Sequence, residues 1–257
     1  MSNPTPPHSE RRPVAYLNDK FLNSPDARAL RILAEFLEPL AHFRREKVRD
    51  TVVFFGSART PEDGPMSKYY ADARTLARKL TEWSDTLTNS TRRFVVCSGG
   101  GPGIMEAANR GAADAGGKSI GLNIGLPHEQ RPNVYVTPGL LFEFHYFFMR
   151  KLWFAHLARA LVIFPGGFGT LDEMMEILTL MQTEKIERRI PVLLYGSEYW
   201  NEIVDFEALA RHGMIDRADL SLFRFADDPA TALRLLQAAM EPPIEVEAPA
   251  IAHSRTS

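Results

Sequence analysis

Short apolar runs alternate with amphipathic stretches along most of this 257-residue chain. Seven runs have the length and composition of strands: "TVVFFGSA", "RFVVCSGG", "SIGLNI", "NVYVT", "ALVIFP", "IPVLLYG" and "LFRFA". Helical patterns such as "SKYYADARTLARKLTEW" and "LDEMMEILTLMQTE" separate them. Runs such as "LVIF" lack strict alternation, which is typical of strands covered on both faces. The pattern predicts an α/β fold, a Rossmann-like, doubly wound, mostly parallel sheet with helices on both faces.

Two further helices are expected outside this simple alternation. One precedes the first strand in "SPDARALRILAEFLEPLAHFRREK", where Ser24 can act as a cap and Pro39 should kink the helix. The other is an aromatic helix from about Leu140 to Arg159. Residues 1–23 and 241–257 are polar and rich in proline, so we expect disordered tails around a single domain at 24–240.

Composition narrows the function classes. A formal charge of −2 gives no global field for nucleic acid or an anionic membrane, and no stretch is long and apolar enough to span a bilayer. The single cysteine, Cys97, and a polar N-terminus predict a reducing, cytoplasmic environment. His145 and His156 have no cysteine or acid cluster at ligand spacing, so no metal is expected.

Three loops that follow predicted strands are rich in glycine or small polar residues: "GSART" at 56–60, "SGGGPGIME" at 98–106 and "PGGFGT" at 165–170. Such loops lie at the carboxyl ends of strands, where helix N-termini present N–H groups to an anion. One of them alone could be a tight turn, but three together indicate a phosphate site. None has the spacing of a P-loop or dinucleotide fingerprint, so a mononucleotide or sugar phosphate fits better than NAD or a triphosphate.

The segment "GTLDE" has two explanations. Thr170 and Glu173 have the spacing of a capping box, which would satisfy free amides at a helix N-terminus. Three acids, Asp172, Glu173 and Glu176, are more than a cap needs. Glu173 and Glu176 share a helix face and could line a cleft as a pair of carboxylates.

The aromatic stretch "FHYFFMRKLWFAHLA" holds only two residues that are always charged, Arg150 and Lys151. A buried guanidinium needs an anion, either a structural acid or a ligand phosphate. The aromatic side chains are expected in the core or in a subunit interface, which favours a homodimer or higher homo-oligomer.

Two of these motifs resemble those of the Lonely Guy (LOG) family. The segment "PGGFGTLDE" matches its Pro-Gly-Gly-x-Gly-Thr-x-x-Glu motif, and "GGGPGIM" resembles its Gly-Gly-Gly-x-x-Gly-x-Met motif. The resemblance runs from about Thr51 to Leu194, and "FHYFFMRK" with the extra N-terminal helix is similar to the longer bacterial branch. The short plant-type enzymes usually read Met-His-x-Arg-Lys where this chain has "FFMRK", and Ser98 replaces the first glycine of the second motif.

The resemblance implies a phosphoribohydrolase without a cofactor. Such enzymes cleave nucleoside 5′-monophosphates, among them AMP and N-substituted AMP in cytokinin activation, to the free base and ribose 5-phosphate. The older family label, lysine decarboxylase, has no support here, because nothing resembles a pyridoxal-phosphate lysine motif. A related group carries molybdenum cofactor on similar glycine loops, so a non-catalytic nucleotide or cofactor carrier remains the alternative.

By position, the resemblance makes Arg150 and Glu173 the catalytic pair, with a family-like separation of 23 residues. The expected substrate contacts come from the three loops, the helix that follows the second loop and the two helices that carry this pair. They are Ser57, Arg59, Gly100, Gly101, Gly103, Met105, Glu106, Asn109, Lys151, Gly166, Gly167, Gly169, Thr170 and Glu176.

Overall fold

The computed structural model describes residues 12–87, 91–125, 131–186 and 190–240. Within them one parallel sheet has the strand order β4-β3-β2-β1-β5-β6-β7. Its strands are β1 (Thr51–Phe55), β2 (Val95–Ser98), β3 (Ser119–Ile124), β4 (Leu141–Phe144), β5 (Ala158–Ile163), β6 (Val192–Tyr195) and β7 (Phe223–Ala226). The predicted doubly wound α/β fold is confirmed.

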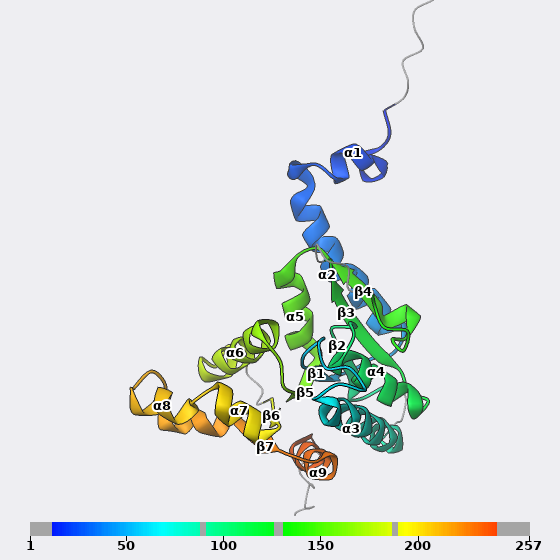
Figure 1. The fold of residues 1–257 in the computed structure, drawn as a ribbon. Helices are drawn as coiled ribbons and strands as arrows, with labels where there is room; N and C mark the ends of the chain where they lie inside the picture. Colours follow the sequence, from blue (N-terminus) through cyan, green and yellow to red (C-terminus); the bar gives the residue numbers. More distant parts are fainter. Residues whose placement is uncertain (1–11, 88–90, 126–130, 187–189, 241–257) are drawn as a thin grey trace, which may run out of the picture.

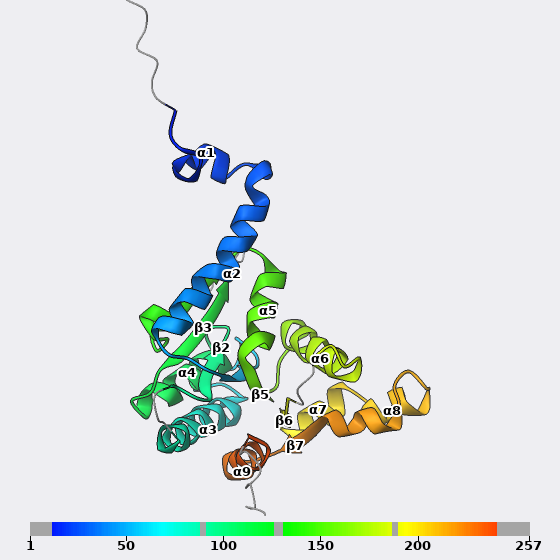
Figure 2. The same ribbon diagram turned by 180° about the vertical axis from the view of Figure 1, so that it is seen from behind.

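Helices cover both faces of this sheet (Figure 1, Figure 2). One face packs against α3 (Ser67–Thr86), α4 (Ile104–Asp114) and α9 (Pro229–Met240), and the other against α2 (Arg28–Arg45), α5 (Phe147–Leu157), α6 (Phe168–Gln182), α7 (Ser197–Ile203) and α8 (Phe206–Arg211). Val52 and Phe54 of β1 belong to the first core, whereas Val53 and Phe55 belong to the second. Double coverage therefore explains why the strand runs are continuously apolar.

The strand order reverses beside β1. The chain builds β2, β3 and β4 outward on one side of β1 and then returns to place β5 on its other side. In doubly wound sheets, ligands bind at such a switch point, at the carboxyl ends of the two central strands. The loops after β1 and β5 are two of the three loops that the sequence marked as a phosphate site.

Residues 12–23, which the sequence placed in a disordered tail, include two helical turns, Ala15–Leu17 and α1 (Asp19–Leu22). The side chain of Asn18 caps α1 by accepting a hydrogen bond from the Phe21 N–H at 3.2 Å. Together with the start of α2, this segment projects away from the sheet (Figure 1, Figure 2).

The predicted Ser24 cap does not form. The Ser24 hydroxyl instead donates to the Phe21 carbonyl at 2.7 Å, and a 3-10 turn at Pro25–Ala27 leads into α2, which begins at Arg28. No described helix is both long enough and apolar enough to cross a lipid bilayer.

The predicted aromatic helix at 140–159 is wrong at both ends. Leu141–Phe144 forms β4, α5 begins at Phe147, and Ala158 already belongs to β5. The stretch is apolar at too many positions for its period to separate a helix from a strand, so pairing with β3 decides the conformation of "LFEF".

The predicted strand "NVYVT" at 133–137 is a turn instead. The Asn133 side chain accepts a hydrogen bond from the Tyr135 N–H at 3.1 Å, a local Asx turn that competes with strand pairing. The position beside β3 that this run was expected to fill is occupied by β4.

Helix α2 continues through Pro39 as a single helix. Because proline has no N–H, one carbonyl of the helix is left free to accept a hydrogen bond from another part of the protein. Pro39 cannot donate to the carbonyl of Glu35, one turn earlier, and the Trp153 indole of α5 donates to that carbonyl at 3.0 Å. The Glu35 carboxylate also accepts the backbone N–H groups of His145 and Tyr146 at 2.8 and 3.2 Å, just before α5. Glu35 thus fixes α5 from two directions.

We predict that the free energy of unfolding depends less on Trp153 in Pro39→Ala, because an alanine N–H can donate to the Glu35 carbonyl within the helix. Trp153→Phe lowers the free energy of unfolding in both backgrounds, and the decrease should be about 1 kcal/mol smaller in Pro39→Ala than in the wild type. Chemical denaturation of the four proteins in the double-mutant cycle measures this difference, and the lost indole volume cancels between backgrounds. Equal costs in both backgrounds would contradict the assignment.

Candidate active site

The three loops predicted to bind phosphate meet at the carboxyl edge of β1, β2 and β5. The Ser57 N–H donates to the Pro165 carbonyl at 3.0 Å, which joins the loops after β1 and β5. The Ile104 N–H donates to the Ser57 carbonyl at 3.1 Å, which joins the loop after β1 to the start of α4. The three loops therefore form one backbone-bonded unit.

Gly103 makes this approach possible. It caps α4 with a φ of 67°, and a Cβ atom there would lie 2.4 Å from the Ser57 carbonyl oxygen. Both the backbone angle and the lack of space therefore require glycine.

Arg150 on α5 reaches this edge from the opposite face of the sheet. Its side chain is only 11% exposed, its Nε donates to the Leu122 carbonyl at 2.8 Å, and its guanidinium lies 5.0 Å from the Phe154 ring centre. Its Nη1 is 3.5 Å from Oε1 of Glu173 on α6. Burial lowers the pKa of Arg150, and the nearby Glu173 carboxylate opposes that shift.

The guanidinium fits because β2 is short and a glycine follows it. β2 pairs with β3 only as far as Ser98 and Gly121, so the Leu122 carbonyl lies beyond the β2 ladder. A Cβ atom on Gly99 would lie 2.6 Å from Nη2 of Arg150. This role of Gly99 could not be predicted from the sequence, because its contact with Arg150 depends on where α5 lies.

Glu173 does not belong to a capping box. Helix α6 begins at Phe168 with Gly167 as its cap, so Thr170 is the third helical residue and Glu173 the sixth. Thr170 is buried and packs on Gly166, where a Cβ atom would lie 2.1 Å from its hydroxyl oxygen. The capping explanation for Thr170 and Glu173 is therefore wrong.

The Glu173 carboxyl is held in a dry position. Its side chain is 14% exposed, and burial raises its pKa to about 7, although the Arg150 charge pulls in the other direction. A carboxyl group that titrates near neutrality can hold or release a proton at working pH.

Lys151 and Glu176 form a separate ion-pair group. The Lys151 ammonium lies 2.8 Å from the Asp172 carboxylate and 3.2 Å from that of Glu176. Glu176 thus pairs with a lysine and does not share a site with Glu173 as a second carboxylate.

Asn109, predicted as a substrate contact, is fully buried and supports the glycine loop from inside the protein. It accepts a hydrogen bond from the Ser98 hydroxyl at 2.7 Å, and that hydroxyl in turn accepts the Gly100 N–H at 3.0 Å. Asn133, which the sequence analysis did not select, donates to the Gly100 and Gly101 carbonyls at 3.0 and 2.9 Å.

The remaining predicted contacts line the open side of the loops. Gly167 and Gly169 are exposed, and a Cβ atom added to either would meet no atom within 4 Å, so their backbone is accessible. The Arg59 N–H donates to the Ser57 hydroxyl at 2.9 Å, and the Arg59 side chain is exposed. Met105 lies against Gly99, because its sulfur would be 2.7 Å from a Cβ atom there. Among the described residues, no three His, Cys, Asp or Glu side chains gather to hold a metal ion.

We predict that two alanine substitutions in the same loop differ in stability. Gly103→Ala strains a left-handed backbone and meets the Ser57 carbonyl, so its Tm should fall by about 5 °C or more. Gly99→Ala keeps an ordinary backbone angle and meets only side-chain atoms of Arg150 and Met105, so its Tm should fall less than half as much. Thermal denaturation followed by circular dichroism compares them, and equal losses would contradict this account.

Comparison with known proteins agrees with this geometry. Residues 105–236, just over half of the chain, match the family model described as possible lysine decarboxylase. The probable cytokinin riboside 5′-monophosphate phosphoribohydrolase LOG4 of Oryza sativa subsp. japonica is 28% identical over 194 residues, which cover 75% of this chain and 78% of that protein.

A bacterial enzyme and a solved structure are also similar. The pyrimidine/purine nucleotide 5′-monophosphate nucleosidase of Escherichia coli (strain K12) is 26% identical over 162 residues, which are 58% of this chain and 35% of that protein. The X-ray structure of TM1055 superposes with a TM-score of 0.53 at 21% identity, covering 74% of this chain and 99% of that one, and shows the same fold. The resemblance of the glycine motifs is thus confirmed, and the chain belongs to the Lonely Guy (LOG) family, whose family model carries the description possible lysine decarboxylase.

Proposed function

We propose that this protein hydrolyses the N-glycosidic bond of nucleoside 5′-monophosphates, with AMP or N-substituted AMP as substrates. The reaction consumes one water and yields the free base and ribose 5-phosphate. The observation that carries the proposal is the buried Glu173 carboxyl, with its pKa raised to about 7, beside Arg150 at the switch point of the sheet. The names of the plant and bacterial relatives support the same class of reaction.

Glu173 supplies the chemistry at the sugar carbon. Cleavage of the bond between C1′ and the base nitrogen passes through an oxocarbenium-like state with positive charge on the sugar. A carboxylate close to C1′ stabilises this charge and accepts a proton from the attacking water. The leaving base takes up a proton as the C–N bond breaks.

Arg150 and the glycine loops position the substrate. The planar guanidinium, fixed by the Leu122 carbonyl, presents its remaining N–H groups to oxygen or nitrogen acceptors of the substrate. The exposed backbone at Gly167 and Gly169 and the N-terminus of α6 bind the 5′-phosphate, with Ser57 and Arg59 from the loop after β1. Because this anchor recognises phosphate, the matching nucleoside should be a poor substrate.

The carrier alternative needs the same phosphate anchor but no buried carboxyl at the sugar. A buried carboxyl group beside the ligand has no use in a protein that only holds an anion, because its charged form would repel that anion. Hydrolysis therefore explains one more feature of the site than transport does.

The decisive test is incubation of the purified protein with AMP and with adenosine, following release of adenine. We expect turnover of AMP and little of adenosine. Glu173→Gln should lower kcat by on the order of a hundredfold or more, because a neutral amide cannot stabilise the sugar cation. Arg150→Lys, which loses the planar fork, should also be severely impaired.

Glu176→Gln is the matched control, since it removes a carboxylate one helical turn away that pairs with Lys151, and it should lose less activity. Turnover close to wild type in Glu173→Gln would reject the catalytic role and favour the carrier. Comparable turnover of adenosine and AMP would reject the phosphate anchor.

The raised pKa gives the same variant a second readout. Above an ordinary value of 4.5 the unfolded chain loses the Glu173 proton, whereas the folded protein keeps it up to about pH 7. The wild type therefore loses stability between these values, and glutamine, which does not titrate, does not. The Tm of Glu173→Gln relative to wild type should thus increase from pH 4.5 to pH 8, and kcat/KM of the wild type should rise with pH up to about 7.

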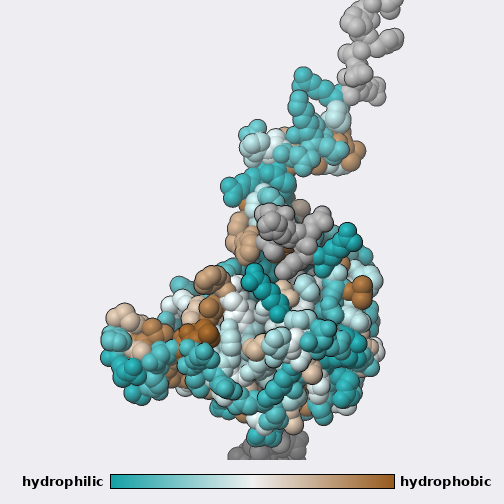
Figure 3. All heavy atoms as spheres, in the orientation of Figure 1, coloured by the Kyte–Doolittle hydropathy of each residue, from teal (hydrophilic) through white to brown (hydrophobic). Residues whose placement is uncertain are grey.

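We further propose that the protein forms a homodimer or higher homo-oligomer through α5 and α6. Phe147, Phe148 and Leu152 on α5 and Phe168 on α6 are 40–93% exposed, and a groove of about 440 Å³ runs between the helices. Figure 3 shows apolar side chains on the side of the molecule where α5 to α8 lie. Such a patch is typical of an interface. Light scattering should give a mass of at least twice 28.9 kDa, and a stable, active 28.9 kDa monomer would contradict the proposal.

A further inference from the structure

The loop between β1 and α3, residues 56–66, has two anchors. Its first residues are fixed by the backbone hydrogen bonds of Ser57 to the other two loops. Its far half is held through Glu62, whose carboxylate lies 2.7 Å from Arg110 of α4 and 3.5 Å from Arg74 of α3. Because Arg59 lies between these anchors, the position of its backbone depends on both.

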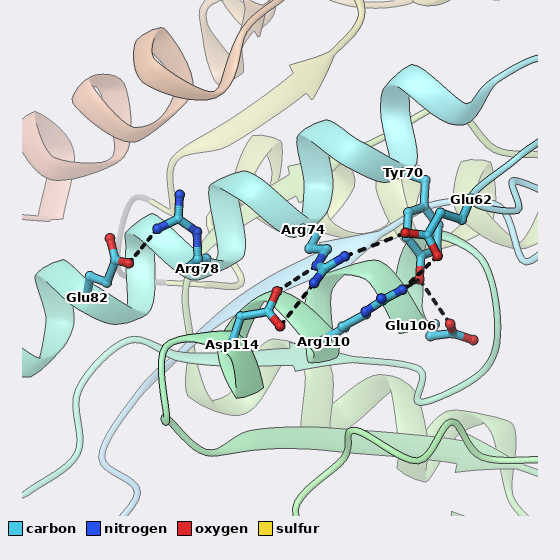
Figure 4. A network of polar contacts seen from close by, with 8 residues as sticks. All are labelled: Glu62, Tyr70, Arg74, Arg78, Glu82, Glu106, Arg110 and Asp114. Atoms are coloured by element: carbon cyan, nitrogen blue, oxygen red, sulfur yellow. Dashed lines mark hydrogen bonds and ion pairs between the residues drawn. The ribbon is translucent and has the colours of Figure 1, made fainter.

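Arg110 links this loop to the first turn of α4 (Figure 4). Its Nη1 also donates to the Tyr70 hydroxyl at 3.4 Å, and that hydroxyl donates to Glu106 at 2.9 Å. Glu106 is the third residue of α4, directly after the loop that Gly103 closes. One polar chain, Glu62–Arg110–Tyr70–Glu106, therefore connects two of the three loops of the candidate site.

The network also gives the Glu106 carboxylate a hydrogen-bond donor at the N-terminus of α4. The Tyr70 hydroxyl donates to Glu106, and the Arg110 guanidinium lies 3.4 Å from the same hydroxyl. Burial raises the pKa of Tyr70, so the hydroxyl stays protonated and remains a donor. The Arg74 guanidinium is itself oriented by a two-point contact with Asp114 at 2.6 and 3.2 Å.

The ion pairs of Glu62 are too exposed to hold the fold together. The side chain of Glu62 is 58% exposed and that of Arg110 is 23% exposed. Ion pairs of this kind contribute little to the stability of the whole fold. Their loss can still change the ratio of ordered to displaced conformations of a surface loop several-fold.

We propose that Arg110 and Tyr70 are positioning residues, which act through Glu62 and Glu106 to hold the Arg59 loop in the arrangement that binds the phosphate of the substrate, with the first turn of α4 fixed beside it. This inference rests on the proposed function and adds to it residues outside the glycine motifs. None of them touches the reacting atoms, so their loss should affect binding and leave the chemical step in place.

The test compares the wild type with Glu62→Gln, Arg110→Met and Arg110→Lys. With AMP as substrate, Glu62→Gln and Arg110→Met should raise KM about fivefold, the effect of losing a partly exposed ion-pair network, with kcat within about twofold. Arg110→Lys keeps the charge and should recover part of the lost KM. The variant with both Glu62→Gln and Arg110→Met should be no worse than either alone, because both changes remove the same contact.

Glu82→Gln is the matched control. Glu82 pairs with Arg78 at 2.7 Å on the same helix α3 and has similar exposure, but it contacts no loop of the site (Figure 4). Its KM should stay at the wild-type value. If Glu82→Gln raises KM as much as Glu62→Gln does, the effect is general surface charge, and the proposal is overturned.

Limited trypsin digestion tests the anchor without relying on activity. Cleavage after Arg59 should be about fivefold faster in Glu62→Gln than in the wild type, and unchanged in Glu82→Gln. Unchanged cleavage in Glu62→Gln overturns the proposal, and so does faster cleavage with an unchanged KM. Absence of AMP hydrolysis in the wild type would instead reject the proposed function, while the digestion still decides whether Glu62 anchors the loop.

Discussion

The site depends on keeping one guanidinium charged inside the protein. Arg150 is almost fully enclosed, and an isolated buried charge is too costly for a folded protein to tolerate. Three elements compensate for it: β3 through the Leu122 carbonyl, α6 through the Glu173 carboxylate, and α5 itself through the Phe154 ring. These elements must therefore hold fixed positions at the edge where the loops after β1, β2 and β5 meet.

Helix α2, which precedes the first strand of the sheet, helps to fix the position of α5 and so of Arg150. Pro39 frees the Glu35 carbonyl for Trp153, and the Glu35 carboxylate binds the backbone just before α5 begins. Trp153 lies one turn after Arg150 on α5, so the contact that fixes the tryptophan also fixes the base of the arginine side chain. A proline that would weaken an isolated helix thus becomes part of the support of the site.

The sequence predicted most strands because burial on both faces leaves continuous apolar runs, as in "TVVFF". It failed at "LFEFHYFF", where nearly every position is apolar and the period carries no information, and at "NVYVT", where Asn133 forms a turn. Arg150 and Glu173 could be selected from a charge in an aromatic helix and from a motif. Gly99 and Asn133 could not, because their roles depend on Arg150 and on glycine carbonyls from distant parts of the chain.

The raised pKa of Glu173 joins stability to the proposed chemistry. At neutral pH the folded protein holds this carboxyl where its charged form is disfavoured, so the position is a local weakness of the fold. Under the proposed function, a positive charge develops on the sugar next to this carboxylate only in the transition state. The unfavourable burial of the anion is then relieved at the moment of bond cleavage, and an interaction that strengthens only at that point lowers the barrier without tightening substrate binding.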